Sequence, residues 1–183
     1  MVKILSYFYK KVLMEFNIVK SLTNEYTHEC AGTRKLLEKV PMDQLSWKPH
    51  EKANSLNDLV LHIVDLPNWV TATLERSELD FATEPYNPKK AATVEELLKI
   101  HDDAVASALK SIANTNAGTL VNDSWTLRNG EQVYFTMPKI GVLRGFALNH
   151  LYHHRGQLVI YLRMLGVSLK GVGLYGPTAE DEM

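Results

Sequence analysis

The chain has 183 residues, of which 45% are apolar and 22% charged, a composition typical of a globular domain with a sizeable core. Its 20 basic and 21 acidic residues give a formal net charge of -1, which excludes a broad basic surface for nucleic acid or an anionic membrane. No apolar run approaches the roughly 18 residues of a membrane span, and no signal-peptide pattern is present. A single cysteine, Cys30, excludes an intramolecular disulfide, so we expect a cytoplasmic protein.

Helical patterns dominate the first part of the chain. The first helix is predicted over about residues 13–40, where Pro41 ends it. After a connector bracketed by two prolines, Ser55 and Asp58 have the spacing of a capping box. A second helix is therefore predicted from Ser55 to about Arg76.

The middle of the chain contains a loop and a third helix. Residues 80–92 include two prolines, which predicts a loop. Thr93 and Glu96 again have the capping-box spacing, and a third helix is predicted from there to about Ala113. The polar residues 114–118 end this helix.

A hairpin and a fourth helix are predicted next. The Asn129-Gly130 pair lies between two β-prone runs and indicates a hairpin over residues 125–135. Pro138 suits the first turn of a helix that continues to about Leu165, where a glycine follows.

These elements predict an all-α fold. We expect a four-helix bundle with a small β-hairpin before the last helix. Residues 1–183 are expected to form one domain, in which residues 1–13 are an N-terminal extension.

The segment 149–157 is the most informative of the chain, because it holds three of the seven histidines. On a helix, His150 and His154 project from one face, at the spacing with which two imidazoles can bind one metal ion. A helical wheel places both near the middle of an apolar stripe about 120° wide. A buried imidazole without a partner costs on the order of 1–3 kcal/mol. Either a metal ion or hydrogen bonds to core carboxylates or hydroxyls must therefore satisfy these rings.

A third histidine, His62, borders the apolar stripe of the second predicted helix and could converge on the same point. Three imidazoles with an open position are the ligand set of a catalytic metal site rather than a closed structural one. Such nitrogen ligands suit zinc, nickel, copper or iron. His150 and His153, three residues apart, are an alternative pair; we prefer His154 because it lies closer to the centre of the stripe.

Three other side chains, Glu29, His101 and Cys30, carry groups that could bind a metal ion or take part in a reaction. Glu29 is either an acceptor for the second ring N–H of a ligand histidine or an ordinary surface glutamate. His101, beside two aspartates, is expected on a solvated face. Cys30 is expected to be a core thiol and a poor nucleophile, because nothing in the sequence lowers its pKa.

Five pieces of the chain carry a family resemblance. They are His28-Glu29 through Leu36-Leu37, Trp47-Lys48-Pro49-His50, Leu59 to Ile63, Asn149 to Gln157, and Tyr175 to Ala179. On these pieces the chain resembles the DinB-like (damage-inducible) family of metal-binding four-helix bundle proteins. The resemblance covers nearly everything from about Met14 onward and is most specific in the histidine block.

The resemblance implies a DinB-like bundle that holds one divalent transition metal ion through His62, His150 and His154, with zinc or nickel as the first candidates. It also implies a homodimer packed helix to helix. Characterised members of the family include transferases and isomerases that use low-molecular-weight thiols such as bacillithiol or mycothiol. The family name records induction by DNA damage and implies no DNA binding.

The first functional hypothesis is a metal-dependent transferase that moves a low-molecular-weight thiol onto an electrophilic small molecule. A metal ion would hold the thiol as a thiolate. Arg155 or Gln157 would orient its polar groups, unless Arg155 forms a surface ion pair. One alternative is a non-enzymatic metal-binding module with a structural or stress-response role. Another is a metal-assisted hydrolase with Glu29 as base.

Overall fold

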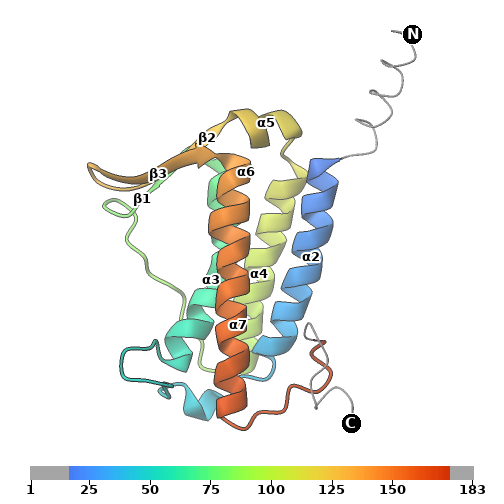
Figure 1. Ribbon diagram of the computed structural model, residues 1–183, viewed down its shortest axis with the longest axis vertical. Helices are drawn as coiled ribbons and strands as arrows, with labels where there is room; N and C mark the ends of the chain where they lie inside the picture. Colours follow the sequence, from blue (N-terminus) through green and yellow to red (C-terminus); the bar gives the residue numbers. More distant parts are fainter. Residues whose placement is uncertain (1–16, 174–183) are drawn as a thin grey trace.

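The structure is a computed structural model that describes residues 17–173, and four long helices in that range run side by side (Figure 1). They are α2 (Ile18–Leu37), α3 (Leu56–Glu75), α4 (Val94–Ala113) and α7 (Asn149–Met164). The predicted extension, the first residues of the first predicted helix and the Tyr175 to Ala179 piece lie outside the described residues. Within the described range, no helix combines the length and the apolar character needed to cross a membrane.

The capping signals of the sequence determine where two of these helices begin. The Ser55 hydroxyl accepts from the backbone N–H of Asp58, whose carboxylate accepts from the backbone N–H of Ser55, so the capping box of α3 is complete. At α4, the Thr93 hydroxyl accepts from the backbone N–H of Glu96, but the Glu96 carboxylate accepts from Ala92 instead of Thr93. Both helices begin at the predicted positions.

The β-structure is larger than the sequence analysis predicts. β1 (Glu78–Asp80), β2 (Ser124–Asn129) and β3 (Gln132–Pro138) form a three-stranded sheet in the order β1-β2-β3, with β1 parallel and β3 antiparallel to β2. Gly130 turns the chain between β2 and β3 at a φ of 59°. The fold is therefore mostly helical with a small sheet rather than all-α. Three residues are too few to show strand periodicity, which is why β1 was missed.

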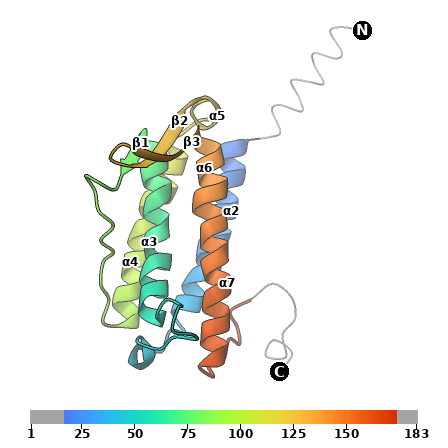
Figure 2. The same cartoon turned by 60° about the vertical axis from the view of Figure 1, so that its left-hand side comes forward.

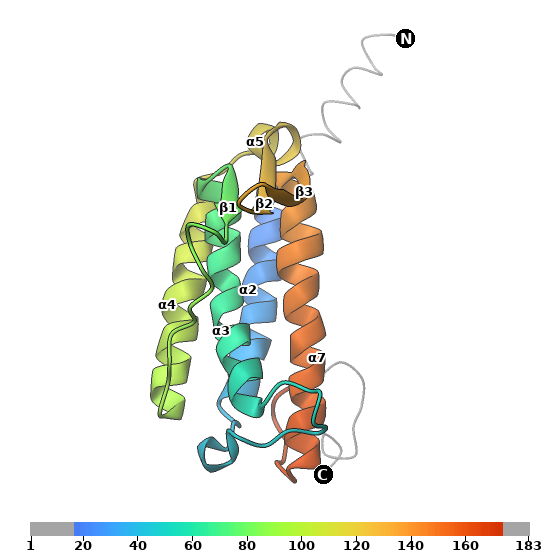
Figure 3. The same cartoon turned by 90° about the vertical axis from the view of Figure 1, so that its left-hand side faces the viewer.

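The sheet lies at one end of the helices, close to the short helix α5 (Ala117–Asn122), which the sequence analysis also missed (Figures 1 and 2). From this end, the segment between β1 and α4 runs back along the outside of the helices to the far end, where α4 begins (Figure 3). This segment, residues 81–93, is named the crossover segment below.

The last predicted helix is interrupted by a π-helical segment. It consists of α6 (Lys139–Val142), the π-helical segment η2 (Leu143–Leu148) and α7. A π turn contains one more residue than an α turn, so it rotates the residues before it by up to about 100° relative to those after it. A helical wheel with one α-helical period for the whole segment ignores this rotation. It therefore places His150 and His154 too close to the middle of the apolar stripe. In α7 the buried side is formed by Leu151, Leu158 and Leu162, and His150 and His154 lie at its border, partly exposed.

Buried Lys139 joins the start of α6 to the end of α3. Its ammonium donates to the carbonyls of Leu74, at 3.0 Å, and Arg76, at 2.9 Å. The last carbonyls of a helix lack partners within the helix, and a cation at this end also interacts favourably with the helix dipole. One side chain therefore both caps α3 and fixes its distance from the last helix.

Lys139→Met should lower the free energy of unfolding by roughly 2–4 kcal/mol, because it removes the charged donor from the buried carbonyl of Leu74 and the partly buried carbonyl of Arg76. Lys90→Met, at an exposed position of the crossover segment, is the matched control and should change it by less than about 0.5 kcal/mol. Urea denaturation measures both variants. Equal losses in the two variants would contradict the capping role of Lys139.

The expectation that His101 is solvated is wrong. Its exposed fraction is 2%, and its Nδ1 lies 3.0 Å from a carboxylate oxygen of Asp102, which also accepts from Arg34 of α2. His101 follows Leu97 and precedes Ala104 on the buried side of α4, so its helical phase indicated burial although its neighbours in sequence are acidic. Burial lowers the pKa of His101, and Asp102 opposes this only in part.

His101 should make stability depend on pH. Its folded pKa is below the unfolded value of about 6.5, so the unfolded chain takes up a proton that the folded chain does not, and stability falls as the pH drops below about 6.5. In metal-free protein, His101→Gln should make the free energy of unfolding less dependent on pH between pH 7 and 5, by up to about 1.4 kcal/mol per pH unit. Denaturation curves across this range test it, and an unchanged slope would refute it.

Candidate metal centre

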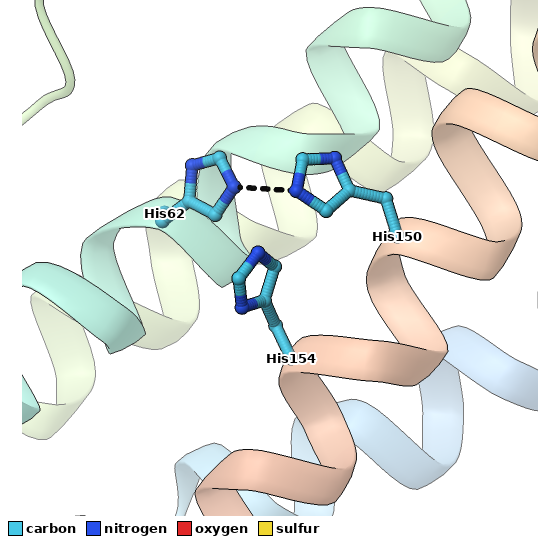
Figure 4. Close-up of side chains that lie close together, drawn as sticks. All are labelled: His62, His150 and His154. Carbon is cyan, nitrogen blue, oxygen red and sulfur yellow. Dashed lines mark hydrogen bonds between the residues drawn. The ribbon is translucent and has the colours of Figure 1, made fainter. Parts of the chain in front are cut away.

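Three histidines from two helices converge at the border between α3 and α7 (Figure 4). His62 comes from α3, and His150 and His154 come from successive turns of α7. One ring nitrogen from each histidine lies within 4.8 Å of the other two. The Nε2 atoms of His62 and His150 are 3.2 Å apart, and the His62 and His154 ring centroids are 4.7 Å apart.

The packing of the two helices explains this convergence. Leu59, Ile63 and Leu66 of α3 are almost completely buried, as is Leu158 of α7. His62 lies next to Ile63 at the edge of the buried side of α3, and His150 and His154 lie at the corresponding edge of α7. When the two apolar sides pack together, the two edges meet and the imidazoles face one another.

The second ring nitrogens of two histidines point away from the cluster toward hydrogen-bond partners. His154 Nδ1 lies 2.7 Å from the side-chain carbonyl oxygen of Gln157, which can only accept, so this contact is a hydrogen bond in the tautomer with the proton on Nδ1. His62 Nδ1 lies 3.1 Å from the hydroxyl of Tyr86. His150 Nδ1 is buried and makes no well-aligned hydrogen bond among the described residues, although an interaction with the Phe146 backbone opposes the lowering of its pKa.

The cluster favours neutral imidazoles. The pKa of His62 is lowered to about 4, first by burial and then by the neighbouring His154 and His150. Burial is also the largest cause of the lowered pKa of His150 and of His154. Neutral rings keep the nitrogen lone pairs that a metal ion requires.

The donor set fits one divalent transition metal ion. The Nε2 atoms of His62 and His150 lie 3.2 Å apart, and two neutral imidazole nitrogens at this distance can share only one proton. Ligation through Nε2 would occupy the lone pairs of all three rings, while the Nδ1–H groups of His62 and His154 donate to the oxygens of Tyr86 and Gln157.

A cavity of about 400 Å³ adjoins the cluster. Its lining combines two of the three histidines with polar and apolar side chains: Asn54, Asp58, Leu61, His62, Tyr86, Pro88 and His154. Its volume suits a small molecule. A ligand in this cavity would lie directly beside His62 and His154.

The other candidate side chains do not belong to the histidine cluster. Arg155 pairs with Glu29 of α2 at 2.5 Å, and both are largely buried, so Glu29 is neither a surface glutamate nor an acceptor for the histidines. Arg155 forms this buried pair rather than a surface one. Cys30 is buried, and burial raises its pKa to about 12, which agrees with the expected inert core thiol. His153 is exposed and does not belong to the cluster.

The sequence analysis missed the aromatic side chains around the histidines. Tyr86 lies in the crossover segment, where only its two flanking prolines stood out. Trp69 has its ring centroid 6.2 Å from that of His150 and 4.6 Å from that of Phe146. A helical phase could have placed Trp69 near His62, since the two are seven residues apart on α3, but no local pattern indicates Tyr86.

The fold and the histidine cluster together define a mostly helical protein with a candidate metal centre. The model of the DinB family matches residues 15–181, and the chain belongs to this family.

Individual relatives are similar over most of their length. The uncharacterized protein YrdA of Bacillus subtilis (strain 168) is 24% identical over 170 residues, covering 91% of this chain and 93% of that protein. The crystal structure of the DinB-like protein YjoA from Bacillus subtilis has a TM-score of 0.62 and 18% identity, covering 86% of this chain and 96% of that one. A DinB-like protein from Bacillus cereus ATCC 10987 has a TM-score of 0.64 and 20% identity, covering 87% and 98%. These two structures share the fold.

Metal content tests the cluster directly. We expect about one transition metal ion per chain in the wild type, and its loss in His62→Ala and His150→Ala, because two imidazoles hold such an ion far more weakly than three. His153→Ala removes an exposed histidine of the same helix and should retain the metal. Inductively coupled plasma mass spectrometry gives the stoichiometry. Wild-type protein that neither contains nor takes up metal would contradict the site.

Proposed function

We propose that this DinB-family protein is a metal-dependent transferase that moves a low-molecular-weight thiol onto an electrophilic small molecule. His62, His150 and His154 would hold one divalent transition metal ion, zinc or nickel, within a four-helix bundle that acts in the cytoplasm as a homodimer, without a nucleic-acid or membrane partner. The observation that carries the proposal is a cluster of three neutral imidazoles that opens on one side to a cavity of small-molecule size.

The cluster favours a catalytic role over a structural one. α3 and α7 already pack through buried leucines and isoleucines, so an ion is not needed to hold them together. The protein supplies three nitrogen ligands rather than the four of a closed structural site. A bound metal ion would supply Lewis acidity and favour the thiolate form of a thiol.

The residues around the cavity would bind and orient the thiol. Asp58 is kept ionised because its pKa is lowered, first by the hydrogen bond with Ser55. With Asn54 it provides a polar rim for the charged or polar groups of a substrate. Leu61 and Pro88 contribute apolar surface to the same cavity. Arg155 is engaged with Glu29, so orientation of the thiol is assigned to this rim rather than to Arg155.

Two alternatives make different predictions. The non-enzymatic module draws support from the fact that one ion would connect α3 with α7, and it predicts a large loss of thermal stability when the metal is removed. The hydrolase requires Glu29 as a base, and the ion pair between Glu29 and Arg155 gives that role no support.

A thiol-transfer screen tests the proposed function. Metal-loaded protein is mixed with a panel of low-molecular-weight thiols and a chlorodinitrobenzene-type electrophile, and conjugate formation is followed by absorbance. We expect turnover with at least one thiol that disappears after chelation and in His62→Ala, and that persists in His153→Ala. If metal binds but no thiol is consumed, and chelation lowers the melting temperature by 10 °C or more (roughly 3–5 kcal/mol for a chain of this length), the structural alternative is supported instead.

A further inference from the structure

The crossover segment reaches the histidine cluster through Tyr86. The Tyr86 hydroxyl lies 3.1 Å from His62 Nδ1, and the two rings meet edge to face with centroids 5.9 Å apart and an interplanar angle of 76°. Pro85 and Pro88 flank Tyr86 closely, and each fixes its own φ near -65°, which restricts the backbone from which the side chain projects.

The hydrogen bond between His62 and the Tyr86 hydroxyl depends on which ring nitrogen of His62 carries the proton, and therefore on which nitrogen can bind a metal ion. If His62 carries its proton on Nδ1, it donates to the Tyr86 oxygen and its Nε2 presents a lone pair to His150 and His154. If the proton is on Nε2, Tyr86 donates instead and His62 cannot bind a metal through Nε2.

We propose that Tyr86 is a positioning residue for His62: its hydroxyl accepts a hydrogen bond from Nδ1–H and thereby stabilises the tautomer and ring orientation in which Nε2 faces the other two histidines. Gln157 has the same relation to His154, but from within the same helix. Tyr86 differs because it comes from a segment outside the long helices. The affinity of the cluster for a metal ion therefore depends on where the crossover segment lies. This inference rests on the proposed metal binding.

The position of Tyr86 between two cavities determines which substitution tests this role. Its ring lines the cavity beside the histidines and also a second one, of about 220 Å³, whose wall includes Trp69 and Phe81. Tyr86→Ala would remove the partition as well as the hydroxyl and would confuse the two effects. Tyr86→Phe keeps the ring and removes only the acceptor.

Two measurements test the proposal, and neither uses catalytic activity. Zinc affinity is determined by competition with a chromogenic chelator, and Tyr86→Phe should bind zinc about 10–100-fold more weakly than the wild type. Long-range ¹H–¹⁵N correlation spectra of the histidine rings in metal-free protein should show His62 with its proton on Nδ1 in the wild type and a mixture of tautomers in Tyr86→Phe.

Tyr134→Phe is the matched control, since Tyr134 is a half-exposed tyrosine on β3 with an exposed fraction of 48%, close to the 47% of Tyr86. It should bind zinc within about twofold of the wild type and leave the His62 spectrum unchanged, the outcome of surface substitutions in general. Wild-type affinity together with a wild-type His62 tautomer in Tyr86→Phe would overturn the proposal. Wild-type protein that binds no metal would refute the proposed function, and a tautomer shift in Tyr86→Phe would still support the role of Tyr86.

Discussion

The packing of α3 against α7 is the constraint on which the candidate site depends, because the ligand atoms are divided between these two helices. Contacts at both ends of the pair hold it in place. At one end Lys139 donates to the last carbonyls of α3, and at the other the Tyr161 hydroxyl of α7 donates to the carbonyl of Asn54, just before α3 begins. The ring of Trp47 meets that of Tyr161 edge to face at the same end, 5.5 Å between centroids. The histidines therefore lie between two fixed points, and their separation is set before any ion binds.

The last helix separates two kinds of polar chemistry. Toward α2 it presents arginines, which pair with Glu25 and Glu29, and the second of these pairs is largely buried. Toward α3 it presents imidazoles whose neutral form is favoured by burial. In an ion pair, each charged group is the partner of the other. Neutral imidazoles that share protons, in contrast, keep nitrogen lone pairs that can bind a metal ion. This difference explains why we assign binding to the α3 side of α7 and a structural role to Glu29.

The features that could be predicted from the sequence are local ones. The starts of α3 and α4 follow from residues three apart, a complete capping box at Ser55 and an N-cap at Thr93, and the shared face of His150 and His154 follows from their spacing on one helix turn. The remaining features depend on contacts between distant segments. β1 exists because it pairs with residues of β2 that lie 48 positions later in the chain, and the burial of His101 depends on α2. Nothing around Tyr86 in the sequence indicates that its hydroxyl lies against His62, because loop geometry alone brings them together.

The number of residues in the π-helical segment determines which way the histidines face. Phe146, within it, packs its ring against Trp69 of α3 and against Trp125 and Phe135 of the sheet, and His150, one turn later, faces His62 of α3. The extra residue of the π turn sets the rotation of the residues that precede it relative to the histidines that follow it. Removing a single residue between positions 143 and 148 would leave the sequence motif around the histidines unchanged but rotate it by about 100° relative to the sheet. A homologue can therefore retain all residues of the motif 149–157 and still lack the metal site. The length of the segment 143–148 indicates the presence of the site as much as the histidines do.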